Sequence, residues 1–242
     1  MIDQTTASVP ETSNQLAELT SQLESSSEKK QLQLIPELVN QGDAGLDVLM
    51  DFLQAQSSTP PSLSVGLAYQ ALYQAKTAKT EEFLQSHFPT GIVPLLSERD
   101  IDYAPLQQLL AQQEFQAADR LTLEKLCELA GSTAVQRKWL YFSELEKFPI
   151  PDLQTINTLW VIHSQGKFGF SVQRELWLSV GKNWEKLWPK IGWKTGNSWT
   201  RYPNEFTWDL SAPKGHLPLS NQLRGVRVIA TLLSHPAWLG DS

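Results

Sequence analysis

The sequence lacks the residue sets of the common catalytic and metal sites. Its 242 residues contain a single cysteine, Cys127, which excludes an intramolecular disulfide and any metal site with several cysteines. The four histidines are scattered without metal-ligand spacing, and no phosphate-binding loop, dinucleotide fingerprint or nucleophile motif is present. We therefore predict no catalytic residue and no metal ligand. Cys127 lies in an apolar helical pattern that predicts a buried thiol.

Long apolar runs and basic segments are also missing. No stretch reaches the ~18 apolar residues of a membrane-spanning helix. The first residues have no apolar signal core, and no basic residue precedes Lys29, so neither a secretory signal nor an Arg-rich transit peptide is predicted. A reducing, cytoplasmic location is expected. The net charge of −6 makes nucleic-acid binding, which depends on phosphate neutralisation, a poor prediction.

Charge and aromatic residues are unevenly distributed along the chain. Residues 1–98 carry 4 of the 20 Lys and Arg and 12 of the 26 Asp and Glu, a net charge of 4 − 12 = −8. The remaining residues carry 16 basic and 14 acidic side chains, a net charge of +2. All nine tryptophans lie at or after Trp139. This asymmetry predicts two parts with different roles.

The first part has a helical pattern of apolar residues with almost no glycine or proline inside its segments. Short amphipathic helices joined by short turns are typical of an antiparallel bundle or a fragment of a helical solenoid, and no clean repeat period decides between them. Pro89, Gly91 and Pro94 then mark a linker. The predicted organisation is a disordered tail, an N-terminal helical bundle, a linker and a core domain, at residues 1–12, 13–88, 89–99 and 100–242.

The second part contains helices with clear start signals, which gives an all-α fold class. The residues predicted to cap its helices are Asp102, Asp152, Ser171, Asn183 and Ser220. From Ile191 to Leu219 the helical pattern disappears, because six glycines and prolines interrupt it. We predict one long, ordered, aromatic loop there, with room for no more than a short hairpin.

The loop contains the segment WKTGNSWTRYPNEFTW, residues 193–208, and is followed by a helix with two basic residues. Arg224 and Arg227 are three residues apart, so their guanidinium groups can reach one patch of space. The face predicted to enter the core holds Leu223, Val226, Ile229, Ala230 and Leu233. Aromatic rings beside paired arginines suit a flat, apolar ligand with carboxylates. Single-stranded nucleic acid would use similar side chains, but the acidic balance and the absence of a wider basic stripe count against it. Carbohydrate stacking is a third alternative, which the paired arginines do not especially favour.

Several motifs together resemble a known family. They are DYAPLQQLL, FGFSVQRELW, LWPKIGW, RYPNEFTWDLSAPKGHLP and LRGVR, spread in order over residues 100–238. The sequence resembles the Genomes Uncoupled Four family of oxygenic phototrophs, in its cyanobacterial two-domain form. The resemblance implies a helical porphyrin-binding core without catalytic activity, which binds protoporphyrin IX and its magnesium derivative non-covalently. It also implies stimulation of magnesium chelatase through the enzyme's large porphyrin-binding subunit, in chlorophyll biosynthesis.

The resemblance also implies a set of porphyrin-binding residues. By motif they are Phe142, Trp199, Tyr202, Asn221, Arg224 and Arg227. Some members of the family have tryptophan where this chain has Tyr202. Tyrosine still offers a flat ring, so binding is expected to be kept, with an effect on ligand affinity. Trp193 and Trp208 are expected to anchor the loop to the helices beneath it. A free-base porphyrin needs no axial ligand, unlike haem.

Other functions remain open on the residues alone. The main alternative is a helical protein-interaction scaffold whose aromatic loop docks a partner rather than a porphyrin. An enzyme acting on tetrapyrroles is least supported, because no acid–base set is present. We expect a monomer without a transmembrane segment. Peripheral membrane association through the apolar porphyrin-binding surface is a further expectation.

Overall fold

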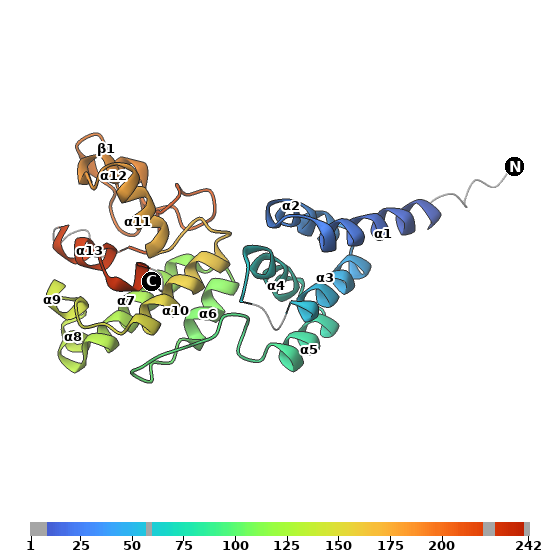
Figure 1. Ribbon diagram of the computed structural model, residues 1–242, viewed down its shortest axis with the longest axis horizontal. Coiled ribbons are helices and arrows are strands. Elements are labelled where there is room, and N and C mark those ends of the chain that lie inside the picture. The colour runs from blue at the N-terminus through green and yellow to red at the C-terminus, as the bar shows by residue number, and fades with distance from the viewer. Residues whose placement is uncertain (1–8, 57–59, 220–225, 240–242) are drawn as a thin grey trace, which may run out of the picture. The chain divides into compact units, whose positions relative to one another are not determined.

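The computed structural model describes residues 9–56, 60–219 and 226–239 of the chain (Figure 1). Helices dominate the described residues, and the prediction of an all-α fold is confirmed. The chain divides into two compact units, Met1–Ile92 and Val93–Ser242, so the boundary falls inside the predicted linker range. Residues 9–12 were predicted to belong to a disordered tail, but they form the first turn of a helix. Pro10 fits that turn, because a proline at a helix start loses no intrahelical hydrogen bond.

The first unit consists of five helices. They are α1 (Val9–Ser25), α2 (Glu28–Val39), α3 (Asp43–Ala55), α4 (Leu63–Ala75) and α5 (Ala78–His87). Helix α2 contacts α1, α3 and α4, and its buried residues Leu34, Ile35 and Leu38 form the centre of this unit. Pro36 lies inside α2.

The second unit contains the remaining elements. They are α6 (Ala104–Ala111), α7 (Phe115–Ala130), α8 (Ser132–Arg137), α9 (Phe142–Leu145), α10 (Ile150–His163), α11 (Phe170–Ser179), α12 (Trp184–Lys190), β1 (Lys194–Thr195), β2 (Ser198–Trp199), α13 (Val226–Leu233) and the 3-10 helix η2 (Pro236–Trp238). Trp160 of α10 is fully buried, and its indole N–H donates to Thr122 Oγ1 of α7 at 2.9 Å. Cys127 of α7 is buried, which confirms that prediction.

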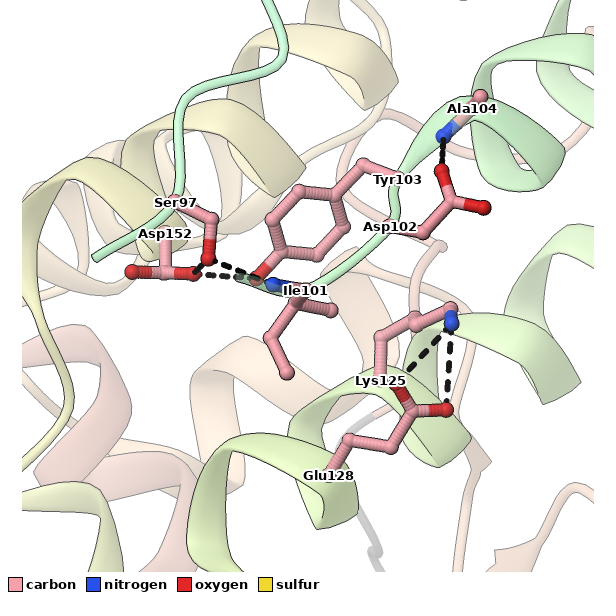
Figure 2. A network of polar contacts seen from close by, with 8 residues as sticks. All are labelled: Ser97, Ile101, Asp102, Tyr103, Ala104, Lys125, Glu128 and Asp152. Atoms are coloured by element: carbon pink, nitrogen blue, oxygen red, sulfur yellow. Dashed lines mark hydrogen bonds and ion pairs between the residues drawn. The ribbon is translucent and has the colours of Figure 1, made fainter. Parts of the chain in front are cut away.

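Asp152 does not cap α10, contrary to the prediction. The helix begins two residues earlier, after Pro149, so Asp152 lies inside its first turn with no exposed surface. Its carboxylate accepts hydrogen bonds from Tyr103 Oη at 2.8 Å, Ser97 Oγ at 2.5 Å and the Glu98 amide at 2.9 Å. Figure 2 shows Ser97 and Tyr103 converging on this carboxylate. Asp152 therefore joins the segment before α6 to α10, because a buried carboxylate requires several donors.

Two further cap predictions have different outcomes. Helix α11 begins at Phe170, so Ser171 is not its cap; the Ser171 amide instead donates to Asn157 Oδ1 of α10 at 2.8 Å. A side chain from the neighbouring helix supplies the acceptor that a local cap would have given. Asn183 caps α12 as predicted, since its Oδ1 accepts from the Lys186 amide at 3.1 Å.

The segment between α12 and residue 219 is an ordered loop, as predicted, and the hairpin β1–β2 is its regular structure. Trp193 is fully buried and its indole N–H donates to the His216 carbonyl at 2.8 Å. His216 Nδ1 in turn hydrogen-bonds the Ile191 carbonyl at 2.7 Å. Gln173 of α11 donates to the carbonyls of Gly215 and Pro218 at 3.0 and 2.8 Å. In this loop, buried hydrogen bonds between side chains and backbone carbonyls fix the backbone where regular secondary structure is missing.

The predicted core face of α13 is partly wrong. Val226 is 40% exposed, whereas Val228, which is not among the residues predicted for that face, is buried with Ile229, Leu232 and Leu233. Helix α13 contacts both α9 and α11, so it buries a wide face centred away from Val226. Leu223 and Ser220 lie outside the described residues.

Candidate ligand cavity

Four tryptophans form a stacked row along α11, α12 and the start of the loop. We call this set the tryptophan row: Trp177, Trp184, Trp188 and Trp193. Neighbouring ring centroids are 4.8, 5.1 and 5.6 Å apart, with interplanar angles of 25°, 19° and 7°. Trp184 and Trp188 are four residues apart in one helix, which places their side chains on the same face. The rings of the row stack on one another, and Trp177, Trp188 and Trp193 are buried.

A cavity of about 470 Å³ lies against the middle of this row. Trp184, Trp188 and Trp199 supply its aromatic wall, and Val226 and Ile229 of α13 also line it. Trp199 packs at 5.6 Å from Trp188 with an interplanar angle of 58°, so its ring is inclined to the row. Lys182, Asn183 and Glu185 complete the lining. Apolar rings with a few polar groups at one edge are typical of a small-molecule site.

One cationic side chain, Lys182, lines this cavity, and others lie near residues that line it. Lys194 Nζ forms an ion pair with Glu185 at 2.6 Å and lies 5.5 Å from the Trp199 ring centroid. Lys182 Nζ lies 5.5 Å from the Trp177 ring. Arg227, adjacent in sequence to the cavity residue Val226, places its guanidinium 5.6 Å from the Phe142 ring of α9. An anionic, flat ligand would find both ring surface and positive charge here.

The predicted site residues fall in different places. Trp199 lines the cavity, whereas Phe142 and Arg227 contact each other and are not among its lining residues. Tyr202 does not line this cavity; it packs at 5.8 Å from Trp208 and 6.4 Å from Phe206. Asn221 and Arg224 lie outside the described residues.

Sequence reasoning did not select Trp184, Trp188 or Glu185 for the site. The segment NWEKLWPK contains two tryptophans four residues apart, a spacing that predicts a shared aromatic face on a helix. Their role in the cavity wall depends on α13, which follows about forty residues later in the chain. The helical spacing was the one signal that could have identified them.

A buried acid lies at the end of the loop. Asp119 of α7 accepts a hydrogen bond from the Leu219 amide at 2.6 Å, and burial raises the pKa of this carboxyl to about 7. Burial raises the pKa of the Tyr202 hydroxyl, and the nearby Asp119 charge adds to the increase. Asp119 therefore connects α7 with the last described residue before α13.

Other ionisable groups of this unit have structural environments. His216 is 2% exposed, and burial lowers the pKa of its imidazole. Its Nε2 accepts from the Thr207 amide at 3.3 Å, so both ring nitrogens bond backbone groups. His163 is fully buried, and burial lowers the pKa of its imidazole to about 3. Across residues 9–56, 60–219 and 226–239, no group of three or more His, Cys, Asp or Glu could hold a metal ion. Within those same ranges, no helix has the length and hydropathy needed to cross a membrane.

Comparison with protein families places the chain among known relatives. A family model described as GUN4-like matches residues 96–236. The chain belongs to the GUN4-like family. This is the family that the motifs resemble, Genomes Uncoupled Four, so that identification is confirmed. A second model, described as the ARM-like repeat domain of the GUN4 N-terminal region, matches residues 7–89 and favours the solenoid form of the first unit.

Individual relatives extend the GUN4-like assignment over both units. A Ycf53-like protein of Synechocystis is 56% identical over 227 residues, covering 93% of this chain and 97% of the relative. A protein of Arabidopsis thaliana named "Tetrapyrrole-binding protein, chloroplastic" is 39% identical over 142 residues, or 55% of this chain and 54% of the relative. The structure of GUN4 from Chlamydomonas reinhardtii superposes with a TM-score of 0.57 at 39% identity, covering 61% of this chain and 94% of that one.

Proposed function

We propose that this GUN4-like protein binds protoporphyrin IX and Mg-protoporphyrin IX in the cavity beside the tryptophan row. The observation that supports this most strongly is the wall of Trp184, Trp188 and Trp199 with Arg227 next to it. A porphyrin is a wide apolar plane with two propionates. Indole rings can cover the plane by stacking, and a guanidinium can form paired hydrogen bonds with a carboxylate. The name of the Arabidopsis relative supports the same ligand class.

The binding test is a titration of the full chain with deuteroporphyrin IX, a soluble porphyrin with two propionates. Because the ligand would lie against the tryptophan row, binding should quench tryptophan emission, with a Kd expected near the micromolar range or below, on the order of 1 µM. Matched titrations of Trp199→Ala and of Trp139→Ala provide the comparison. Trp139 stacks at 4.3 Å on the Arg137 guanidinium and does not line the cavity, so only Trp199→Ala should weaken binding. An absence of saturable quenching in the wild type would overturn the proposal.

We further propose that the porphyrin-loaded protein stimulates magnesium chelatase through its large porphyrin-binding subunit, as a regulator and not as an enzyme. This step rests on family membership. The assay measures Mg-porphyrin formation by purified chelatase subunits with the wild-type chain, with Arg227→Glu, and without either. The wild type alone should form no product. Equal stimulation by the wild type and by a variant that does not bind porphyrin would separate activation from ligand binding.

Location, oligomeric state and membrane association are also part of this proposal. A relative that matches nearly the whole chain is cyanobacterial, which supports a cytoplasmic location. We expect a monomer that associates with membranes at most peripherally. Light scattering on the purified chain, with and without porphyrin, tests the oligomeric state.

A second candidate is a protein-docking scaffold. Trp199 is 41% exposed and Tyr202 is 45% exposed, and exposed aromatic residues are enriched in protein interfaces. This function predicts no porphyrin affinity together with partner binding that is lost on changing residues 193–208. Chelatase-subunit binding that survives porphyrin-site substitutions but not Tyr202→Ala would favour it.

A further inference from the structure

The two side chains of the Lys194–Glu185 ion pair, at the edge of the cavity, differ in solvent exposure. Glu185, in the first turn of α12, has a 72% exposed side chain, whereas the Lys194 side chain is only 15% exposed. Lys194 is the cross-strand partner of Trp199 in the hairpin, and its ammonium lies 5.5 Å from that ring. The ammonium is therefore covered by the cavity wall on one side and bonded to a solvated carboxylate on another.

The partly buried Lys194 ammonium requires a counterion nearby, whereas the exposed Glu185 carboxylate is stabilised by water and does not depend on Lys194. Removing a charge from water is costly unless an opposite charge is close. An exposed glutamate, in contrast, is well solvated, so the free energy of its ion pair is small. Any carboxylate that enters the cavity can therefore take the place of Glu185 at little cost.

Lys182 adds a second positive charge at the same edge. It lines the cavity, and no carboxylate among the described residues forms an ion pair with it. Its ammonium lies above the Trp177 ring, at the end of the tryptophan row. Lys182 and Glu185 line the cavity at its α12 edge, and Lys194 of β1 reaches this edge through its ion pair with Glu185, while Arg227 belongs to α13.

We infer that Lys182 and Lys194 form a second anion subsite of the cavity, in which Glu185 is the resident counterion that a ligand carboxylate displaces. The inference rests on the proposed porphyrin function and assigns a further requirement to the ligand. The ligand is a dicarboxylate that uses both the α13 side and the α12 edge. Its neutral diester loses the contacts with the two lysines.

The decisive variant is Glu185→Gln, which keeps the side-chain shape and removes the competing charge. We expect it to bind deuteroporphyrin IX about two- to fivefold more tightly than the wild type, because Lys194 loses its internal counterion. Glu175→Gln is the matched control: Glu175 pairs with Lys214 at 3.2 Å, away from the cavity lining, and its loss changes the net charge equally. Its affinity should equal that of the wild type.

The lysine variants are expected to change deuteroporphyrin IX affinity in the opposite direction, towards weaker binding. Lys194→Gln and Lys182→Gln should each weaken binding several-fold, while Lys214→Gln should not. With deuteroporphyrin dimethyl ester as the probe, Glu185→Gln and Glu175→Gln should bind equally. Raising the salt concentration should reduce the gain of Glu185→Gln. Near-ultraviolet circular dichroism checks that the hairpin is retained in Lys194→Gln.

Each outcome decides between the inference and its alternatives. Weaker binding by Glu185→Gln would mean that the ion pair serves to position Trp199, and it would overturn the counterion exchange. Equal binding by Glu185→Gln and Glu175→Gln would also overturn it. A wild type that shows no porphyrin binding contradicts the proposed function itself, and is recognised before any variant is compared.

Discussion

Two aromatic clusters in the second unit are built from the same residue types but have different surroundings. The tryptophan row leaves Trp184 and Trp188 on the wall of a cavity with lysines at its edge. The other cluster, which we call the loop cluster, consists of Tyr202, Phe206, Trp208 and His216. In that cluster Trp208 donates to the Pro203 carbonyl at 2.9 Å and His216 is enclosed by backbone.

The comparison shows that aromatic content alone does not identify a binding wall. Both clusters derive from one aromatic stretch and its flanks, and both contain rings that stack or meet at an angle. The difference lies in what faces the rings. Aromatic rings that line a cavity near positively charged side chains can bind a ligand. Aromatic residues whose polar atoms form hydrogen bonds with the backbone of the loop instead stabilise the loop.

The largest expected effect separates a buried member of the tryptophan row, Trp193, from the exposed ring on the cavity wall, Trp199. Trp193 is fully buried, so Trp193→Ala should lower the free energy of unfolding by about 3–5 kcal/mol, because it leaves a cavity and an unpaired His216 carbonyl. Trp199→Ala, at a 41% exposed position, should cost under about 1 kcal/mol. Urea unfolding of both variants measures the difference. Equal losses would remove the distinction.

The next effect concerns the acid beneath the loop cluster. The pKa of Asp119 is about 7 in the folded protein and about 3.8 unfolded, so the folded state binds the extra proton between these values. Its stabilising contribution is complete below pH 3.8 and is lost as the pH rises through 7. Asp119→Asn keeps an acceptor for the Leu219 amide and removes this titration. The variant should gain about 1–3 kcal/mol over the wild type between pH 5 and pH 8.

Urea unfolding at several pH values tests the Asp119 prediction. The difference between the wild type and Asp119→Asn isolates this carboxyl, since His163 titrates in both proteins. A stability difference that does not change with pH would show that the carboxyl is charged throughout this range. Ligand affinity measured in parallel shows whether the anchor at Leu219 also affects the cavity.

A smaller effect is expected for the α13 side of the cavity. Arg227→Glu should weaken deuteroporphyrin IX binding by about 10- to 100-fold, because it replaces a carboxylate partner with a repelling charge. Arg201→Glu changes an exposed arginine of the loop by the same charge and should have little effect. Tryptophan quenching gives both affinities. An unchanged Kd for Arg227→Glu would exclude this arginine as a carboxylate contact.

The smallest effect sharpens the contrast between the clusters. Because Tyr202 belongs to the loop cluster, Tyr202→Phe should change porphyrin affinity by less than about twofold. Trp199→Phe, which reduces ring area on the cavity wall, should have the larger effect. Isothermal titration of the two variants compares them directly. A greater loss for Tyr202→Phe would return Tyr202 to the ligand site that the family motifs imply.

Local patterns in the sequence were sufficient for much of the helical architecture. The apolar period, the glycines and Asn183 predicted helices close to those observed, and the interrupted stretch after Ile191 was correctly interpreted as a long ordered loop with a short hairpin. These features depend on neighbouring residues. Helical periodicity and caps are properties of segments a few residues long.

The failures occurred where a distant segment supplies the deciding contact. Asp152 looked like a helix cap but is an acceptor for residues more than forty positions earlier. Val226 looked like core but borders the cavity, because α9 and α11 cover the neighbouring faces of α13. Trp184 and Trp188 became part of a wall only when α13 was placed beside them.

The amino-acid sequence by itself therefore determined the fold class, the ordered aromatic loop and the family. Composition, local periodicity and ordered motifs carry that information along the chain. Only the tertiary structure decided which aromatic rings line a cavity and which are packed against backbone. It also decided which charged side chains form ion pairs, such as Glu185 with Lys194. Cavities and ion pairs are formed by residues far apart in sequence, and their free energies depend on burial, which no local pattern specifies.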